Sequence, residues 1–264
     1  MKKNIFKSNG FQSLLASLLC IVLGLFLGYL VLLVINPAGA GEAILTVVKN
    51  FLTYKKTSSQ LKYLGNTLVK TAPLLMCSLS ILFAYKVGLF NIGAPGQYLI
   101  STMVTLMVAL SIPSSAVPAG VIWVLAFLAG CLSGALWGAI PGLVKALLNI
   151  NEVLACIMTN WIAANLVTWM FDISNFKNMV ESTKSGYIYK TTFNGVATPK
   201  LGLDAIFPGS QVNGGILVAI VIAIAMYILM NKTTLGYELK ACGANRHAAR
   251  YAGINEKKNI ILSM

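Results

Sequence analysis

Residues 14–35 read LLASLLCIVLGLFLGYLVLLVI, a run of apolar and small residues without a single charge. A helix of this length crosses the hydrocarbon core of a bilayer, which is about 30 Å thick. The rest of the chain agrees, because 57% of its residues are hydrophobic and only 10% are charged. Soluble domains carry roughly 25% charged residues. The stretch therefore predicts an integral membrane protein whose helices pack against each other within lipid.

Further apolar stretches predict more membrane spans after the first. We place them at about 64–85, 98–112, 117–140, 152–171 and 215–230. The predicted fold class is all-α, a polytopic transmembrane helix bundle of about six spans in which residues 1–264 form a single transmembrane domain. A new apolar run, at residues 259–264, predicts the start of a seventh span.

One segment between the second and third spans is unlike a regular helix. Residues 86–97 include Gly88, Gly93, Pro95 and Gly96. Glycine and proline disfavour a continuous helix, and irregular backbone near the membrane is tolerated where it lines a cavity. We therefore predict a broken or partly re-entrant element here.

Charge distribution predicts the orientation of the bundle. The basic start of the chain favours a cytoplasmic N-terminus, and counting spans then places the 172–214 loop outside and the 231–258 segment in the cytoplasm. Lys and Arg are more numerous on the inner segments than in the outer loops, as the positive-inside rule requires. Contact with anionic membrane lipid accounts for the net charge of +13, so we predict no nucleic acid partner.

Small and polar residues mark particular faces of two spans. Gly130, Gly134 and Gly138 recur every four residues and predict a stripe where another helix approaches closely. Asn160 and Asn165 are polar residues within the fifth span. Polar groups inside a membrane are functional candidates, although hydrogen bonding between helices explains them equally well.

The segment from Gly236 to Ile254 carries the signals of a short capped helix. Asn245 is a suitable N-cap, and Gly253 suits the left-handed C-terminal cap. We expect Ala241, Ala248 and Ala252 to share one face that receives a partner protein. A helix that merely lies on the membrane surface is the alternative.

The sequence argues against several chemical activities. It contains no HExxH, no GxSxG and no G-x-x-x-x-G-K-[ST], so we expect no catalytic residue and no ATP hydrolysis by this chain. A single histidine and five cysteines without a CxxC pair predict no metal site. An ion-coupled secondary transporter would place ionisable residues within its spans, where this chain offers chiefly Lys70, with Lys86 and Glu152 at span ends.

Three blocks of sequence resemble a known family. They are GLFNIGAPGQ at 88–97, NEVLACIMTN at 151–160 and GANRHAARYAGI at 243–254. Their order and spacing are similar to those of the permease subunits of ATP-binding-cassette (ABC) importers for simple sugars and nucleosides, the ribose-type permeases that are related to branched-chain amino acid permeases. The nucleoside branch is the more similar, and a ribose-type sugar importer is the alternative.

The resemblance implies a multi-pass subunit of the bacterial plasma membrane with several partners. These are two ABC ATPase subunits, a second permease chain that is either identical or paralogous, and an extracellular substrate-binding lipoprotein. The ATPases use ATP, and the permease itself binds no cofactor. The cytoplasmic 231–258 segment then contains the coupling helix, with Gly243, Asn245, Ala248, Ala249 and Gly253 at the contact. The implied substrate path includes Phe90, Asn91, Gln97, Asn160 and Trp161, with Phe90 as a surface on which a base stacks.

The chain departs from the family pattern in two ways. The glutamate of the first block is Pro95 here. The family also continues through further spans after the coupling segment, so the resemblance predicts that residues 1–264 are C-terminally truncated.

Overall fold

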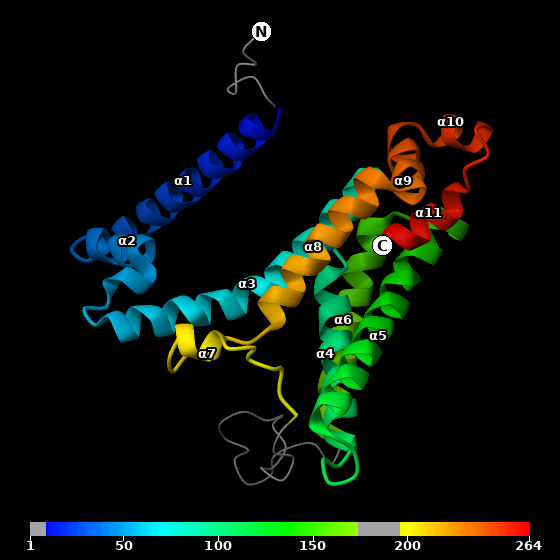
Figure 1. The fold of residues 1–264 in the computed structure, drawn as a ribbon. Helices are drawn as coiled ribbons and strands as arrows, with labels where there is room; N and C mark the ends of the chain where they lie inside the picture. Colours follow the sequence, from blue (N-terminus) through cyan, green and yellow to red (C-terminus); the bar gives the residue numbers. More distant parts are fainter. Residues whose placement is uncertain (1–8, 174–195) are drawn as a thin grey trace. The chain divides into compact units, whose positions relative to one another are not determined.

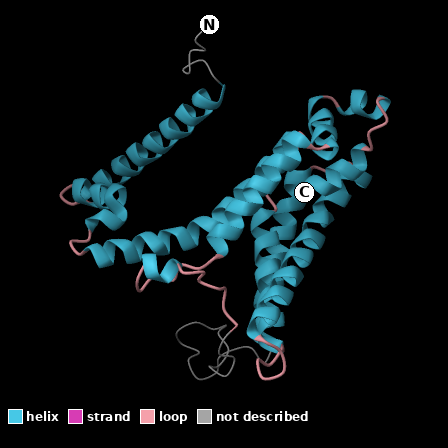
Figure 2. Cartoon of the chain, viewed as in Figure 1, coloured by secondary structure: helices cyan, strands magenta, loops and turns pink. Residues whose placement is uncertain are grey.

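The computed structural model describes residues 9–173 and 196–264. Every regular element in that part of the chain is helical, and none is a strand (Figure 2). This confirms the predicted all-α class. The elements are α1 (Asn9–Ile35), α2 (Ala40–Lys49), η2 (Asn50–Thr53), α3 (Thr57–Lys86), α4 (Ala94–Ser111), α5 (Ala119–Leu148), α6 (Glu152–Ile173), α7 (Leu203–Ile206), α8 (Gly215–Lys232), α9 (Thr234–Ala244), α10 (Arg246–Tyr251) and α11 (Glu256–Ser263).

Six of these helices are long and apolar enough to cross a membrane: α1, α3, α4, α5, α6 and α8. They match the six predicted spans. Many of their large apolar side chains point outward, such as Leu132 and Leu136 of α5, each 63% exposed. Outward apolar side chains suit helices that are surrounded by lipid rather than water.

The chain divides into two compact units, and the first contains the described residues up to Gly65 together with 206–210. Here α1 is followed by the short helix α2, which gives way to η2 at Asn50, whose φ is +45°. The 206–210 segment packs on Gly65, where an added Cβ would lie 2.6 Å from the Ser210 hydroxyl oxygen.

The second unit, described within residues 66–205 and 211–264, contains the three closely packed helices α4, α5 and α6 (Figure 1). The glycine stripe of α5 lies against α4. A Cβ built on Gly130 or Gly134 would overlap the hydroxyls of Thr105 and Ser101, and one on Gly138 would lie 2.7 Å from the Gln97 amide nitrogen. The absence of side chains therefore allows the two helices to approach closely.

A second core lies where α3, α9, α10 and α11 meet. Ala84, Val87, Leu239, Cys242 and Ala249 are all buried in one cluster there. This cluster attaches the short helices α9 and α10 to the end of a membrane-spanning helix, so the segment between α8 and α11 packs on the bundle.

The predicted break between the second and third spans is present, but it is shorter than expected. It comprises residues 87–93, and Gly88 takes a positive φ of 73° that favours glycine. Helix α4 already begins at Ala94. Pro95 lies in its first turn, where a missing backbone N–H costs nothing, so Pro95 and Gly96 belong to the helix rather than to the break.

Candidate functional site

The break is held in place by side-chain amides, of which Asn91 is the most buried. Its side chain is fully buried. Its Nδ2 donates to the Ser80 hydroxyl at 3.0 Å and to the Met264 carbonyl at 3.1 Å. Its Oδ1 accepts from the Gly93 backbone N–H at 2.8 Å. Asn91 thus connects the break to α3 and to the end of α11.

Asn160 connects the same region to α6. Its Nδ2 donates to the Ile92 carbonyl at 2.9 Å, and its Oδ1 accepts from the Gly96 backbone N–H at 2.9 Å. The first backbone N–H groups of a helix have no partner within the helix. Asn160 therefore satisfies two backbone groups at the entry to α4 from a neighbouring helix.

Gln97 reaches from the first turn of α4 to both the amide network and a cavity. Its Nε2 donates to the Met264 carbonyl at 2.6 Å, and its Oε1 lies 3.5 Å from the Ser80 hydroxyl. The cavity that it lines has a volume of about 580 Å³, within the range of small-molecule sites.

The cavity wall combines hydroxyls, aromatic rings and small residues. Its polar groups besides Gln97 are Ser80, Ser101 and Thr105, and its aromatic rings are Tyr98 and Phe127. A second cavity of about 390 Å³ shares part of the wall and is also lined by Trp123 and Thr198. The residues common to both cavities are Pro73, Met76, Thr105, Phe127 and Cys131.

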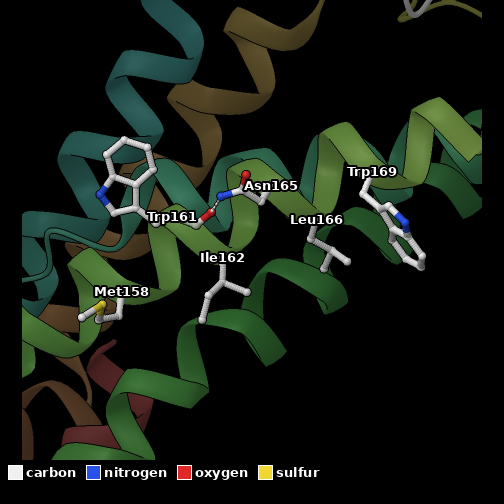
Figure 3. Close-up of a pocket in the computed structure, with 6 residues that line it drawn as sticks. All are labelled: Met158, Trp161, Ile162, Asn165, Leu166 and Trp169. Carbon is white, nitrogen blue, oxygen red and sulfur yellow. Dashed lines mark hydrogen bonds between the residues drawn. The ribbon is translucent and has the colours of Figure 1, made fainter.

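Two residues of the predicted path lie elsewhere. Phe90 is 49% exposed and Trp161 is 69% exposed, and neither lines the cavity beside Gln97. Trp161 instead borders a shallow depression on the outer face of α6 (Figure 3). Its neighbours there are Met158, Ile162, Asn165, Leu166 and Trp169. The predicted path residues are therefore separated: Asn91 and Asn160 lie in the amide network, Gln97 lines the cavity, Trp161 borders this open face, and Phe90 is exposed elsewhere, on the break.

The short capped helix that was predicted after Asn245 is present as α10. The Asn245 side chain caps it by accepting from the Ala248 backbone N–H at 3.1 Å, and Gly253 follows with a φ of +80°. Ala249 is buried, whereas Ala248 is exposed and the Tyr251 side chain is 95% exposed. One face of α10 is thus attached to the bundle and the other is free.

The expected alanine face is wrong in one respect. Ala241 belongs to α9, not to α10, because Asn245 is extended and separates the two helices. Ala248 and Ala252 remain together on α10 or directly after it.

Two contacts connect the coupling segment to the break. A Cβ on Gly243 would overlap the Lys86 carbonyl oxygen, so α9 and the end of α3 touch through backbone. Arg246 also donates to the Gly88 carbonyl at 3.2 Å. The start of α10 is therefore joined to the segment that the amides Asn91 and Asn160 hold.

Three residues that the structure places at the cavity or on the exposed face of α10 were not predicted from the sequence. Ser101 and Thr105 stand one helical turn apart on the α4 face that meets the glycine stripe, a spacing that the sequence displays. Tyr251 stands among alanines, and no signal in the sequence marks its exposure. Across the described residues, no three potential metal-ligating side chains gather in one place.

Residues 63–264 match the family described as the permease component of the branched-chain amino acid transport system. The chain belongs to this permease family. Its six apolar helices accordingly make it a multi-pass membrane protein, which in bacteria is located in the plasma membrane.

Individual relatives of this permease extend along most of the chain. It is 34% identical to the guanosine ABC transporter permease protein NupP of Bacillus subtilis, over 95% of this chain and 67% of the relative. It is 33% identical to the nucleoside ABC transporter permease protein NupB of Lactococcus lactis, over 97% of this chain and 68% of the relative. A glucose ABC transporter permease protein of Haloferax volcanii is 32% identical over 73% of this chain and 50% of its own length. No solved structure matches the chain.

Proposed function

We propose that this permease is the membrane subunit of an ABC importer that moves nucleosides into the cell. The observation that carries the proposal is the similarity to a guanosine permease along 95% of the chain, with a nucleoside permease at nearly the same identity. The two relatives match this chain over 252 and 259 residues, respectively.

The cavity offers the chemistry that a nucleoside needs. A nucleoside has a flat aromatic base and a ribose that carries hydroxyl groups. Tyr98 and Phe127 supply aromatic faces for the base. Ser80, Ser101 and Gln97 supply donors and acceptors for the sugar. None of the described residues that line the cavity has a charged side chain, which suits a neutral solute.

The path residues acquire different proposed roles. Gln97 contacts the solute directly, whereas Asn91 and Asn160 are positioning residues that fix the start of α4 and hence the Gln97 side chain. A role for Phe90 and Trp161 requires that the solute also pass their exposed faces, because neither borders the cavity.

ATP hydrolysis belongs to partner ATPase subunits in this proposal, and the permease binds no cofactor. The ATPases dock on the free face of α10, around Ala248 and Tyr251, while the buried Ala249 keeps the helix attached. When ATP closes the ATPases, α10 moves and the Arg246 bond to Gly88 conveys the displacement to the break. A second permease chain completes the path, and an external binding lipoprotein delivers the solute.

Uptake of labelled solutes tests the function. Cells with and without the complete gene receive guanosine, adenosine, ribose or glucose, and ATP depletion and a protonophore are applied separately. We expect nucleoside uptake that depends on the gene and on ATP but not on the proton gradient. Uptake of ribose or glucose alone would favour the sugar importer, for which the glucose permease relative speaks. Collapse by the protonophore at constant ATP would favour an ion-coupled transporter instead.

A further inference from the structure

A groove between α3 and α8 has one apolar part and one basic part. It has a volume of about 500 Å³ and is separate from the cavity that Gln97 lines. Its apolar wall comes from Leu79, Leu82 and Phe83 of α3 and from Ala223 and Met226 of α8. Its polar residues are Lys86, Tyr227, Asn231 and Lys240.

The basic part of the groove lies where two membrane spans end. Lys86 is the last residue of α3, and Asn231 is in the last turn of α8. The level at which spans end is the level of lipid headgroups, where Lys and Tyr are favoured. A ligand that enters the groove from the bilayer therefore meets apolar side chains and ammonium groups together.

The lysine of α9 is held in place by neutral groups. Lys240 Nζ donates to Asn231 Oδ1 at 2.8 Å, and Asn231 Nδ2 in turn donates to the Tyr227 carbonyl at 3.0 Å. An ammonium has three donors, so Lys240 keeps two for a ligand. Its position at the groove is set by the Asn231 side chain.

Neither lysine is neutralised by a carboxylate in the described part of the chain. The glutamates of the second unit at this level have other partners. Glu152 pairs with Lys145, Glu256 with Arg250, and Glu238 accepts from Asn259. Two positive charges at the mouth of an apolar groove are therefore left for an anionic ligand that also carries apolar chains.

We propose that this groove binds one anionic phospholipid. Its phosphate contacts Lys86 and Lys240, and an acyl chain lies along Leu82, Ala223 and Met226. Basic pockets between membrane helices recognise anionic headgroups in this way. The lipid would stand beside Leu79 and Phe83, which also face the space between α3, α8 and α11.

Lipid binding to the purified full-length permease in detergent tests the proposal without any uptake assay. Native mass spectrometry and the unfolding midpoint are measured with phosphatidylglycerol, phosphatidylcholine or glycerol phosphate. The variant pair is K86Q/K240Q and the control K257Q/K258Q, which removes the same charge from two exposed lysines outside the groove. A223F fills the apolar part while keeping both ammonium groups.

We expect phosphatidylglycerol to bind and to raise the midpoint, and K86Q/K240Q to weaken it about thirtyfold. K257Q/K258Q should remain within about twofold of the parent, since its lysines do not line the groove, and A223F should weaken binding. Equal binding of phosphatidylcholine, or unchanged affinity in K86Q/K240Q or A223F, would overturn the proposal. Equal protection by glycerol phosphate would also overturn it, because a free anion would then suffice.

Discussion

Asn160 in the middle of α6 accepts a hydrogen bond from the backbone N–H of Gly96, 2.9 Å away in the first turn of α4. The same side chain donates to the Ile92 carbonyl. The structure thus provides α4 with a cap from another helix, while the residue at its own N-cap position, Gly93, has no side chain to offer. This arrangement makes Asn160 a positioning residue for everything that α4 carries toward the cavity.

Replacing Asn160 with leucine should destabilise the permease. The substitution leaves the Gly96 N–H and the Ile92 carbonyl without partners, and each such buried group costs about 1–3 kcal/mol. We expect a loss of about 2–4 kcal/mol of unfolding free energy together with loss of uptake. The matched control is Asn165→Leu on the same helix, because Asn165 is exposed and, among the described residues, its side chain bonds only to the Trp161 carbonyl. Thermal unfolding in detergent compares the two, and equal midpoints would contradict the role of Asn160.

Filling the cavity should block transport without unfolding the protein. Ala135 lines the cavity, whereas its neighbour Leu136 points away from the bundle. Ala135→Phe places a ring in the space proposed for the solute, so initial uptake of guanosine should fall at least about tenfold, which corresponds to about 1.4 kcal/mol. Leu136→Phe should transport at the parental rate. Normal uptake by Ala135→Phe would mean that the solute takes another route.

Replacing a glycine of α5 with alanine should change stability by an amount that depends on how closely a neighbouring group packs against that glycine. Alanine is better than glycine in a helix by up to about 1 kcal/mol. A Cβ on Gly120 meets nothing within 4 Å, but one on Gly138 would lie 2.8 Å from the Met264 carbonyl oxygen. Gly120→Ala should therefore leave the unfolding midpoint unchanged or raise it. Gly138→Ala should lower stability by about 1–3 kcal/mol through overpacking. A similar response from both variants would argue against close packing at Gly138.

The free face of α10 can be tested with tyrosines of similar exposure. Tyr251 is 95% exposed and Tyr237, on α9, is 72% exposed. Because both side chains are exposed, neither Tyr251→Ser nor Tyr237→Ser should affect folding. Large aromatic residues at interface centres contribute about 2 kcal/mol or more, so Tyr251→Ser should weaken co-purification of the ATPase subunits about thirtyfold. Tyr237→Ser serves as the control. If the ATPases remained bound to Tyr251→Ser, docking on α10 through this ring would be wrong.

Local signals in the sequence predicted most of the helices. The long apolar runs predicted all six spans because a membrane helix needs a long apolar stretch and little else. Asn245 and Gly253 predicted the ends of α10 because capping depends on residues within one turn. The extended backbone at Asn245 also explains the error at Ala241, since a cap residue begins one helix and so ends the face shared with the helix before it.

The candidate site was less predictable because it depends on distant residues. Asn160 and Asn165 have the same side chain on the same helix, yet one bonds to the break and the other bonds back to its own helix. Asn91 meets the Met264 carbonyl across 173 residues of chain. No periodicity in the sequence marks such a partner. The cavity that Gln97 shares with Ser101 and Thr105 forms only when four helices, α3, α4, α5 and α11, come together.

The backbone contact between Gly243 and Lys86 limits where the bundle can bend. There is no room at this contact even for a methyl group, so α9 and the end of α3 should move as one rigid body. Any bending of α3 that opens or closes the cavity should then occur farther along the helix. Pro73 supplies such a hinge, because its ring removes the hydrogen bond to the Val69 carbonyl. Pro73 borders both cavities. Bending at Pro73 would therefore change the width of the cavity that Gln97 lines whenever α10 is displaced.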